Sequence, residues 1–74
     1  MAHRTPLKKA RVARGQTLAE VATIVGTDVG NLSRIERGIQ VPSPSLASKL
    51  ATHFKKDGLT EIHILYPERF RVAA

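Results

Sequence analysis

Residues 26–38 read GTDVGNLSRIERG, a short stretch with a glycine at each end. The leading glycine permits the tight turn that a pair of helices needs, and the threonine after it or Asp28 offers an N-cap oxygen to the next helix. Leu32 and Ile35 are three residues apart and can face a core together. The stretch predicts a helix over 28–37 whose outer face carries polar and small residues. Such a helix either contacts a partner or is an ordinary amphipathic surface helix.

Composition indicates one small basic domain. Of the 74 residues, 42% are hydrophobic, which is enough for a modest core. The sequence contains no cysteine, which excludes disulfides and thiolate metal sites. Twelve Lys and Arg against six Asp and Glu give a formal net charge of +6, which favours nucleic acid over a membrane surface as the partner. One Tyr, two Phe and no Trp disfavour single-strand binding, which relies on stacking aromatic side chains.

No segment predicts membrane insertion or secretion. The apolar runs are far too short to cross a bilayer, and the first residues lack the apolar stretch of a signal peptide. We therefore expect a soluble, cytoplasmic protein.

Capping residues predict two helices before the quoted stretch. Thr5, followed by proline, begins a basic helix over about 6–14. Thr17 and Glu20 have the spacing of a capping box, which begins a helix over about 18–25. The two helices and the quoted stretch follow one another closely.

The segment after residue 38 predicts a loop and one or two further helices. Two prolines force an extended loop, after which Ser43 or Ser45 caps a helix through about Phe54. Its apolar stripe is predicted to be Leu46, Leu50, Ala51 and Phe54. Residues 59–66 fit a short helix, which we favour, or a strand.

Taken together, these elements resemble the XRE-like, Cro and phage-repressor family of helix-turn-helix domains. The resemblance covers about residues 5–56 and rests on the ungapped spacing of Arg11, Ala22, Gly26, Ile35, Glu36 and Gly38. It implies an all-α, lambda-repressor-like bundle of four to five short helices, in which the third helix enters the major groove of double-stranded DNA. We expect a single domain over 1–74, with 57–74 capping the core.

The C-terminal segment carries more apolar residues than the capping of a small core requires. They are Ile62, Ile64, Leu65, Tyr66 and Phe70. We expect part of this segment to form a twofold homodimer interface, the alternative being that it only covers the first and fourth helices. A homodimer would bind a near-palindromic site.

The resemblance implies base contacts from the helix over 28–37. The matching positions are Asp28, Val29, Gly30, Ser33 and Arg34. Val29 offers only an apolar contact, such as one to a thymine methyl group, and Gly30 offers backbone alone. Arg34 is the one residue of this set that can make a bidentate contact with guanine. Direct readout is therefore expected to be sparse, with DNA shape or a second half-site adding specificity.

The resemblance also implies phosphate contacts at both ends of the helix-turn-helix. They involve Thr17, Leu18, Asn31, Arg37 and Gln40, to which we add the basic Arg14. Because many relatives carry glutamine where Leu18 stands, only the helix dipole and N–H groups of that anchor are expected to act, with Leu18 turned inward or covering sugar. Arg11 and Glu36 match a partly buried ion pair between the first and third helices.

The residues do not predict catalysis. The three histidines lie in separate segments, and His53 with His63 would lack a third ligand for zinc. We expect no enzyme activity, no metal, no cofactor and no small-molecule ligand. The function expected is sequence-specific regulation of transcription on the nucleoid, with repression favoured; the alternative is an antitoxin or protein-interaction adaptor that uses the same fold.

Overall fold

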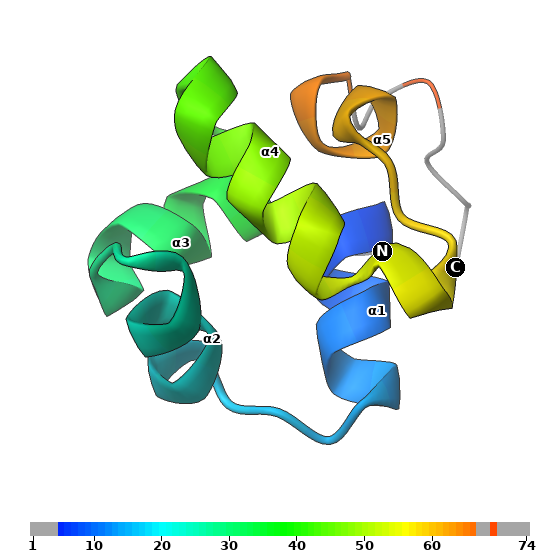
Figure 1. The fold of residues 1–74 in the computed structure, drawn as a ribbon. Helices are drawn as coiled ribbons and strands as arrows, with labels where there is room; N and C mark the ends of the chain where they lie inside the picture. Colours follow the sequence, from blue (N-terminus) through cyan, green and yellow to red (C-terminus); the bar gives the residue numbers. More distant parts are fainter. Residues whose placement is uncertain (1–4, 67–68, 70–74) are drawn as a thin grey trace.

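The computed structural model describes residues 5–66 and Arg69, and these fold into short helices (Figure 1). They are α1 (Pro6–Ala13), α2 (Leu18–Val25), α3 (Val29–Glu36), α4 (Pro44–His53), the 3-10 turn η1 (Lys55–Asp57) and α5 (Glu61–Leu65). The described residues contain no strand, so the all-α prediction is confirmed, and residues 61–65 take the helical alternative. Among these helices, none is long and apolar enough to cross a membrane.

Side-chain caps begin the helices where the sequence predicts them. Thr17 and Glu20 form the capping box of α2, with Glu20 N–H donating to Thr17 Oγ1 over 3.1 Å. Of the two alternatives at α3, Asp28 is the N-cap, and of the two at α4, Ser43 is. Each cap accepts a backbone N–H three residues later, which satisfies a donor that the first turn leaves without a partner.

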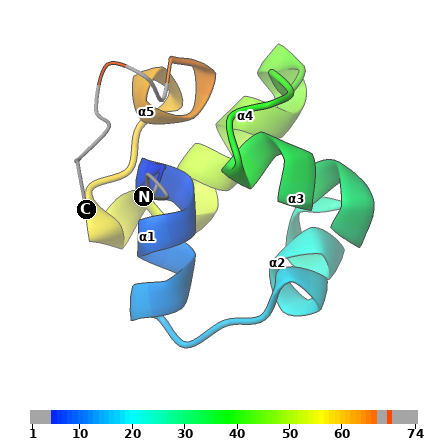
Figure 2. The ribbon, with the colours of Figure 1, turned by 180° about the vertical axis from the view of Figure 1, so that it is seen from behind.

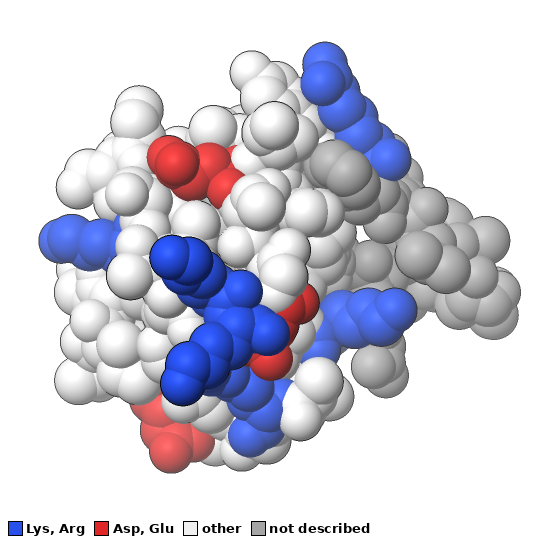
Figure 3. Space-filling view, turned by 45° about the vertical axis from the view of Figure 1, so that its right-hand side comes forward, with Lys and Arg blue, Asp and Glu red and all other residues white. Residues whose placement is uncertain are grey.

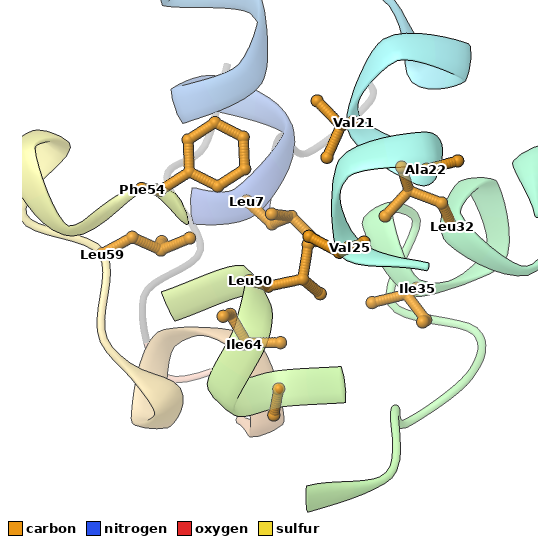
Figure 4. Close-up of a cluster of buried hydrophobic side chains, with 11 residues drawn as sticks. Leu7, Val21, Ala22, Val25, Leu32, Ile35, Leu50, Phe54, Leu59 and Ile64 are labelled. Carbon is orange, nitrogen blue, oxygen red and sulfur yellow. The ribbon is translucent and has the colours of Figure 1, made fainter. Parts of the chain in front are cut away.

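The core draws side chains from every α-helix (Figure 4). It consists of Leu7, Val21, Ala22, Val25, Leu32, Ile35, Ala47, Leu50, Phe54, Leu59 and Ile64. The predicted stripe of α4 needs one correction. Ala47 is fully buried together with Leu50 and Phe54, whereas Leu46 and Ala51 are only half-buried on the flanks of that row. The spacing of three and four residues along this row is that of one helix face.

The C-terminal helix divides its apolar residues between the core and the surface. Ile64 is buried, so it is part of the core rather than of a free interface, which corrects the larger set expected from sequence. Ile62 and Tyr66 are exposed, Leu65 is half-buried, and Phe70 lies outside the described residues. Figures 1 and 2 place α5 and α3 on opposite sides of the molecule.

Candidate nucleic-acid interface

The turn between α2 and α3 is set by Gly26. This glycine has a φ of +77°, in the left-handed region that residues with a β-carbon rarely adopt. The chain reverses there, and Thr27 N–H donates to Ala22 O over 2.9 Å. Bonds of this kind close the end of one helix and fix the start of the next. The chain therefore leaves α2 at a left-handed glycine that this hydrogen bond closes.

The two faces of α3 have opposite characters. Leu32, Ile35 and Glu36 are buried at 0%, 2% and 3% exposure. The other face carries the positions expected to meet bases: Val29, Gly30 and Arg34 are exposed, and Ser33 is half-buried. The structure therefore brings these four residues together on one accessible surface.

Asp28 has a structural role at the start of this surface. Its carboxylate Oδ1 accepts the backbone N–H of Asn31 over 2.7 Å, which makes it the N-cap of α3. A negative charge is favourable there because the N-terminus of a helix carries partial positive charge. The carboxylate is thus used within the helix, and a contact from Asp28 to a base stays a prediction.

The Arg34 guanidinium extends back along α3 and lies close to Gly30. A β-carbon placed on Gly30 would be 3.5 Å from Arg34 Nη1 and 3.4 Å from Asp28 Oδ1. Helical side chains lean towards the N-terminus, which explains why residue 34 reaches the turn of residue 30. The small residue leaves room for the guanidinium on the exposed face.

A chain of side-chain hydrogen bonds runs beside Arg34. Arg34 Nε donates to Gln40 Oε1 over 2.8 Å, Gln40 Nε2 donates to Asn31 Oδ1, and Asn31 Nδ2 donates to Thr27 Oγ1 over 2.8 Å. Sequence reasoning missed this chain. The spacing of four residues between Thr27 and Asn31 was the one local signal, because Gln40 is brought to α3 only by the path of the loop.

The loop after α3 is folded back onto the helix end. Gly38 has a φ of +75°, its N–H donates to Ile35 O over 3.1 Å, and Ile39 N–H donates to Arg34 O over 3.0 Å. These two bonds are those of a Schellman motif, which ends a helix at a left-handed glycine. The motif carries Gln40 to the side of Arg34.

The N-terminus of α2 offers backbone donors next to an acidic side chain. Leu18 is half-buried against the core, as expected for a residue turned inward. Thr17 N–H donates to Glu20 Oε1 over 2.8 Å, so it is used within the cap. Hydrogen bonds from the Thr17 backbone and then from its hydroxyl lower the pKa of Glu20. The ionised carboxylate weakens the attraction of this helix end for phosphate.

Arg14, expected at phosphate, lies within a cluster at the end of α4. Its Nε is 2.9 Å from Asp57 Oδ2, its Nη1 is 3.4 Å from His53 Nε2, and its guanidinium carbon is 5.5 Å from the centre of the Phe54 ring. The charge of Arg14 is thus balanced by Asp57. A phosphate contact from this residue would have to compete with that pairing.

Arg37 lies at the C-terminus of α3 and is exposed. Its Nε donates to Ser33 O over 3.3 Å, a contact within its own helix. No ion pair involves Arg37 within residues 5–66 and Arg69. The charge therefore stays available to an anion at this end of the helix.

Arg11 and Glu36 join α1 to α3. Arg11 Nε lies 2.5 Å from Glu36 Oε2, Nη2 donates to Glu36 Oε1 over 3.2 Å, and Nη1 donates to Gln16 O over 2.7 Å. Thr5 Oγ1 adds a hydrogen bond to the Glu36 carbonyl oxygen over 2.5 Å. The C-terminal end of α3 is thereby held at two points, by Arg11 of α1 and by Thr5, the N-cap residue of α1.

Positive charge is not confined to α3. The face drawn in Figure 3 carries several Lys and Arg side chains, most closely gathered at its centre, with acidic groups beside them. The overall charge favours attraction to a polyanion, but the distribution of charge does not by itself single out α3.

A model of the helix-turn-helix family matches residues 7–58 of this chain. The chain belongs to the XRE-type helix-turn-helix family. It is similar to the transcriptional regulator ClgR of Mycobacterium tuberculosis, strains CDC 1551 / Oshkosh and H37Rv, with 44% identity over 46 residues in each case. That match covers 62% of this chain and 41% of each relative, so the chain spans less than half their length. No solved structure gives a significant match.

Proposed function

We propose that this protein regulates transcription by binding double-stranded DNA in a sequence-specific manner, with α3 in the major groove. The exposed face of α3, with Arg34 above Gly30, is the observation that carries the proposal. Membership of the helix-turn-helix family and the similarity to a transcriptional regulator support it. The net charge of +6 favours association with a polyanion.

The residues on and around α3 divide into base and backbone contacts. We assign Val29 and Ser33 to contacts with base edges and Arg34 to a bidentate contact with guanine, because all three lie on the accessible face of α3. We assign Arg37 to phosphate, which sets orientation without carrying sequence information, and the N–H groups at the start of α2 to a weaker phosphate contact that the Glu20 carboxylate opposes. Few of the exposed side chains on α3 are strong hydrogen-bonding readers, so sequence-dependent DNA shape contributes to specificity.

Repression is the mode of regulation that we favour. A protein bound over a promoter excludes other proteins from the same stretch of duplex, which requires no contact with them. The alternative of an antitoxin or adaptor, which would use α3 to hold a protein, is less consistent with this face. Protein-binding surfaces are enriched in aromatic anchors, and the exposed positions of α3 include none.

A homodimer through α5 completes the proposal. Ile62, in α5, and Tyr66, the residue that directly follows the helix, are both exposed apolar side chains. α5 lies on the opposite side of the molecule from α3 (Figures 1 and 2), so pairing there leaves α3 accessible. Two copies would place their recognition helices on half-sites about one DNA turn apart.

Selection of bound duplexes from a random pool tests the proposal directly. We expect an enriched near-palindromic sequence whose affinity falls steeply with salt. A reporter with that sequence placed over its promoter then tests repression, with a scrambled site as the matched control. A pool that remains unenriched would refute sequence-specific regulation and turn attention to a protein partner.

A further inference from the structure

Gln40 was expected to contact phosphate, yet both ends of its side-chain amide are engaged within the protein. Oε1 accepts from Arg34 Nε over 2.8 Å, and Nε2 donates to Asn31 Oδ1. Asn31 is itself tied to Thr27 Oγ1 over 2.8 Å. The carbonyl end of an amide accepts and the amino end donates, so these hydrogen bonds hold the Gln40 side chain in one orientation.

We propose that Gln40 is a positioning residue that orients Arg34 towards a guanine base. The inference rests on the proposed function and names the base that this surface recognises. With Nε donating to Gln40, the guanidinium keeps its terminal Nη1 and Nη2 edge for another acceptor. Two parallel N–H donors at that edge match O6 and N7 of guanine in the major groove.

The contact between Gln40 and Arg34 is built into the end of α3. The Arg34 carbonyl oxygen accepts N–H groups from Ile39 over 3.0 Å and from Gln40 over 3.3 Å. The loop and residue 34 are thus joined through both backbone and side chain. The hydrogen bond to Gln40 restrains the Arg34 side chain before any contact with DNA, so less rotamer entropy remains to be lost when it contacts a base.

The location of the guanidinium is consistent with this role. Arg34 Nη1 lies 3.5 Å from where a β-carbon on Gly30 would stand, on the exposed side of the first turn of α3. No carboxylate in the described part of the chain lies within ion-pair distance of Arg34. The guanidinium is therefore held on the exposed face of α3 without a direct ion pair, and the Asp28 carboxylate approaches the same point from 3.4 Å.

The test compares Gln40→Met with the unmodified protein in selection from random DNA. Methionine keeps the length of the side chain and removes both hydrogen-bonding ends. We expect unmodified protein to prefer guanine at one position of each half-site, and Arg34→Ala to abolish that preference. Gln40→Met should reduce the preference by about tenfold at the same position and leave the others unchanged.

Two further variants separate positioning from phosphate contact and from folding. Gln40→Glu keeps an acceptor for Arg34, so it should retain the guanine preference while its added negative charge lowers affinity for every sequence. Arg37→Ala should weaken all sequences equally and serves as the phosphate control. Thermal unfolding of Gln40→Met should match that of the unmodified protein, because this loop side chain is only partly buried.

The outcomes distinguish this inference from the proposed function. A guanine preference that Arg34→Ala removes but Gln40→Met keeps overturns the positioning role alone, as does uniform weakening by Gln40→Met. A preference that survives Arg34→Ala also overturns it. Unmodified protein without any sequence preference overturns the proposed function, and this inference with it.

Discussion

Arg11 and Glu36 form a two-point ion pair that fixes the end of α3 to α1. Glu36 has a side-chain exposure of 3% and Arg11 of 13%, so the pair is largely withdrawn from water. Burial makes the partners depend on each other, because a buried charge left without its counterpart is strongly unfavourable. The pair therefore ties the C-terminal end of α3 to α1 from the buried side of the helix.

Glu36→Ala should destabilise the fold by roughly 3 to 5 kcal/mol, because it leaves Arg11 without its buried partner. Affinity of the molecules that remain folded should fall much less. Thermal unfolding and DNA titration below the melting temperature measure the two effects. Asp57→Asn is the control, because it breaks the more exposed ion pair with Arg14. The Arg14 and Asp57 side chains are 28% and 26% exposed, so this change should lower the free energy of unfolding by only about 0 to 1 kcal/mol. Equal melting temperatures for Glu36→Ala and the unmodified protein would contradict the prediction.

Gly30→Ala should separate stability from binding. Glycine within a helix costs about 0.5 to 1 kcal/mol relative to alanine, and the new β-carbon would make ordinary contacts of 3.4 and 3.5 Å with Asp28 and Arg34. We expect a higher melting temperature together with weaker DNA binding, since the methyl group projects from the recognition face beside Arg34. DNA affinity equal to that of the unmodified protein would show that this face does not approach DNA closely.

Arg37→Ala and Val29→Gln should affect binding in different ways. Loss of the Arg37 charge removes a phosphate contact, so affinity should fall equally for all sequences and the slope of log affinity against log salt should decrease by about 1.

A glutamine at position 29 adds a side chain that can pair with adenine, so base preference should shift. Titration at several salt concentrations and selection from random DNA measure these effects. A shift in base preference with Arg37→Ala, or uniform weakening with Val29→Gln, would contradict the assignment of Arg37 to phosphate and of Val29 to bases.

The stability of the fold should depend on the protonation of His53. Partial burial lowers the pKa of the imidazole, the Arg14 charge lowers it further, and Asp57 opposes both. The folded pKa thus lies below the ordinary value of 6.5, so the contribution of His53 is complete above that pH and is lost as pH falls through the folded pKa. His53→Gln should lose less unfolding free energy between about pH 8 and about pH 5 than the unmodified protein. Chemical denaturation at a series of pH values measures the effect. Equal changes of unfolding free energy with pH in the two proteins would contradict the prediction.

Ile62→Lys should convert a dimer to a monomer. Ile62 is 53% exposed on α5, and a charge there would have to be buried at the proposed interface. Ile24→Lys is the matched control, because Ile24 is 55% exposed on α2, away from that interface. Sedimentation of both variants at tens of micromolar, with and without DNA, measures the effect. Unmodified protein that sediments as a monomer in both conditions would defeat the dimer proposal.

Much of the helical framework follows from the amino-acid sequence. Thr17 with Glu20, and the glycines that end α2 and α3, act on backbone groups a few residues away. Such interactions need no distant partner, so the bounds of α2 match those predicted and α3 is capped at one of the two residues considered. The ion pair between Arg11 and Glu36, by contrast, was implied by family resemblance and not by local pattern.

Packing decided the points that local pattern left open or missed. Ala47 is buried ahead of Leu46, and Ile64 belongs to the core, because burial depends on which helices pack against each face. Arg14 meets Asp57, far along the chain, and its charge is balanced there. No spacing rule foresees such a contact.

The candidate site divides in the same way. The outward positions of α3 follow from helical periodicity, since Leu32 and Ile35 can face the core on only one side of the helix. The contact between Gln40 and Arg34 depends on the loop folding back at Gly38, which brings a side chain from outside α3 onto its surface. Caps and periodicity act within one or two turns of the chain and are therefore encoded locally. The partners of Arg14, Arg34 and Gln40 are set only when the folded chain places distant residues within hydrogen-bonding distance.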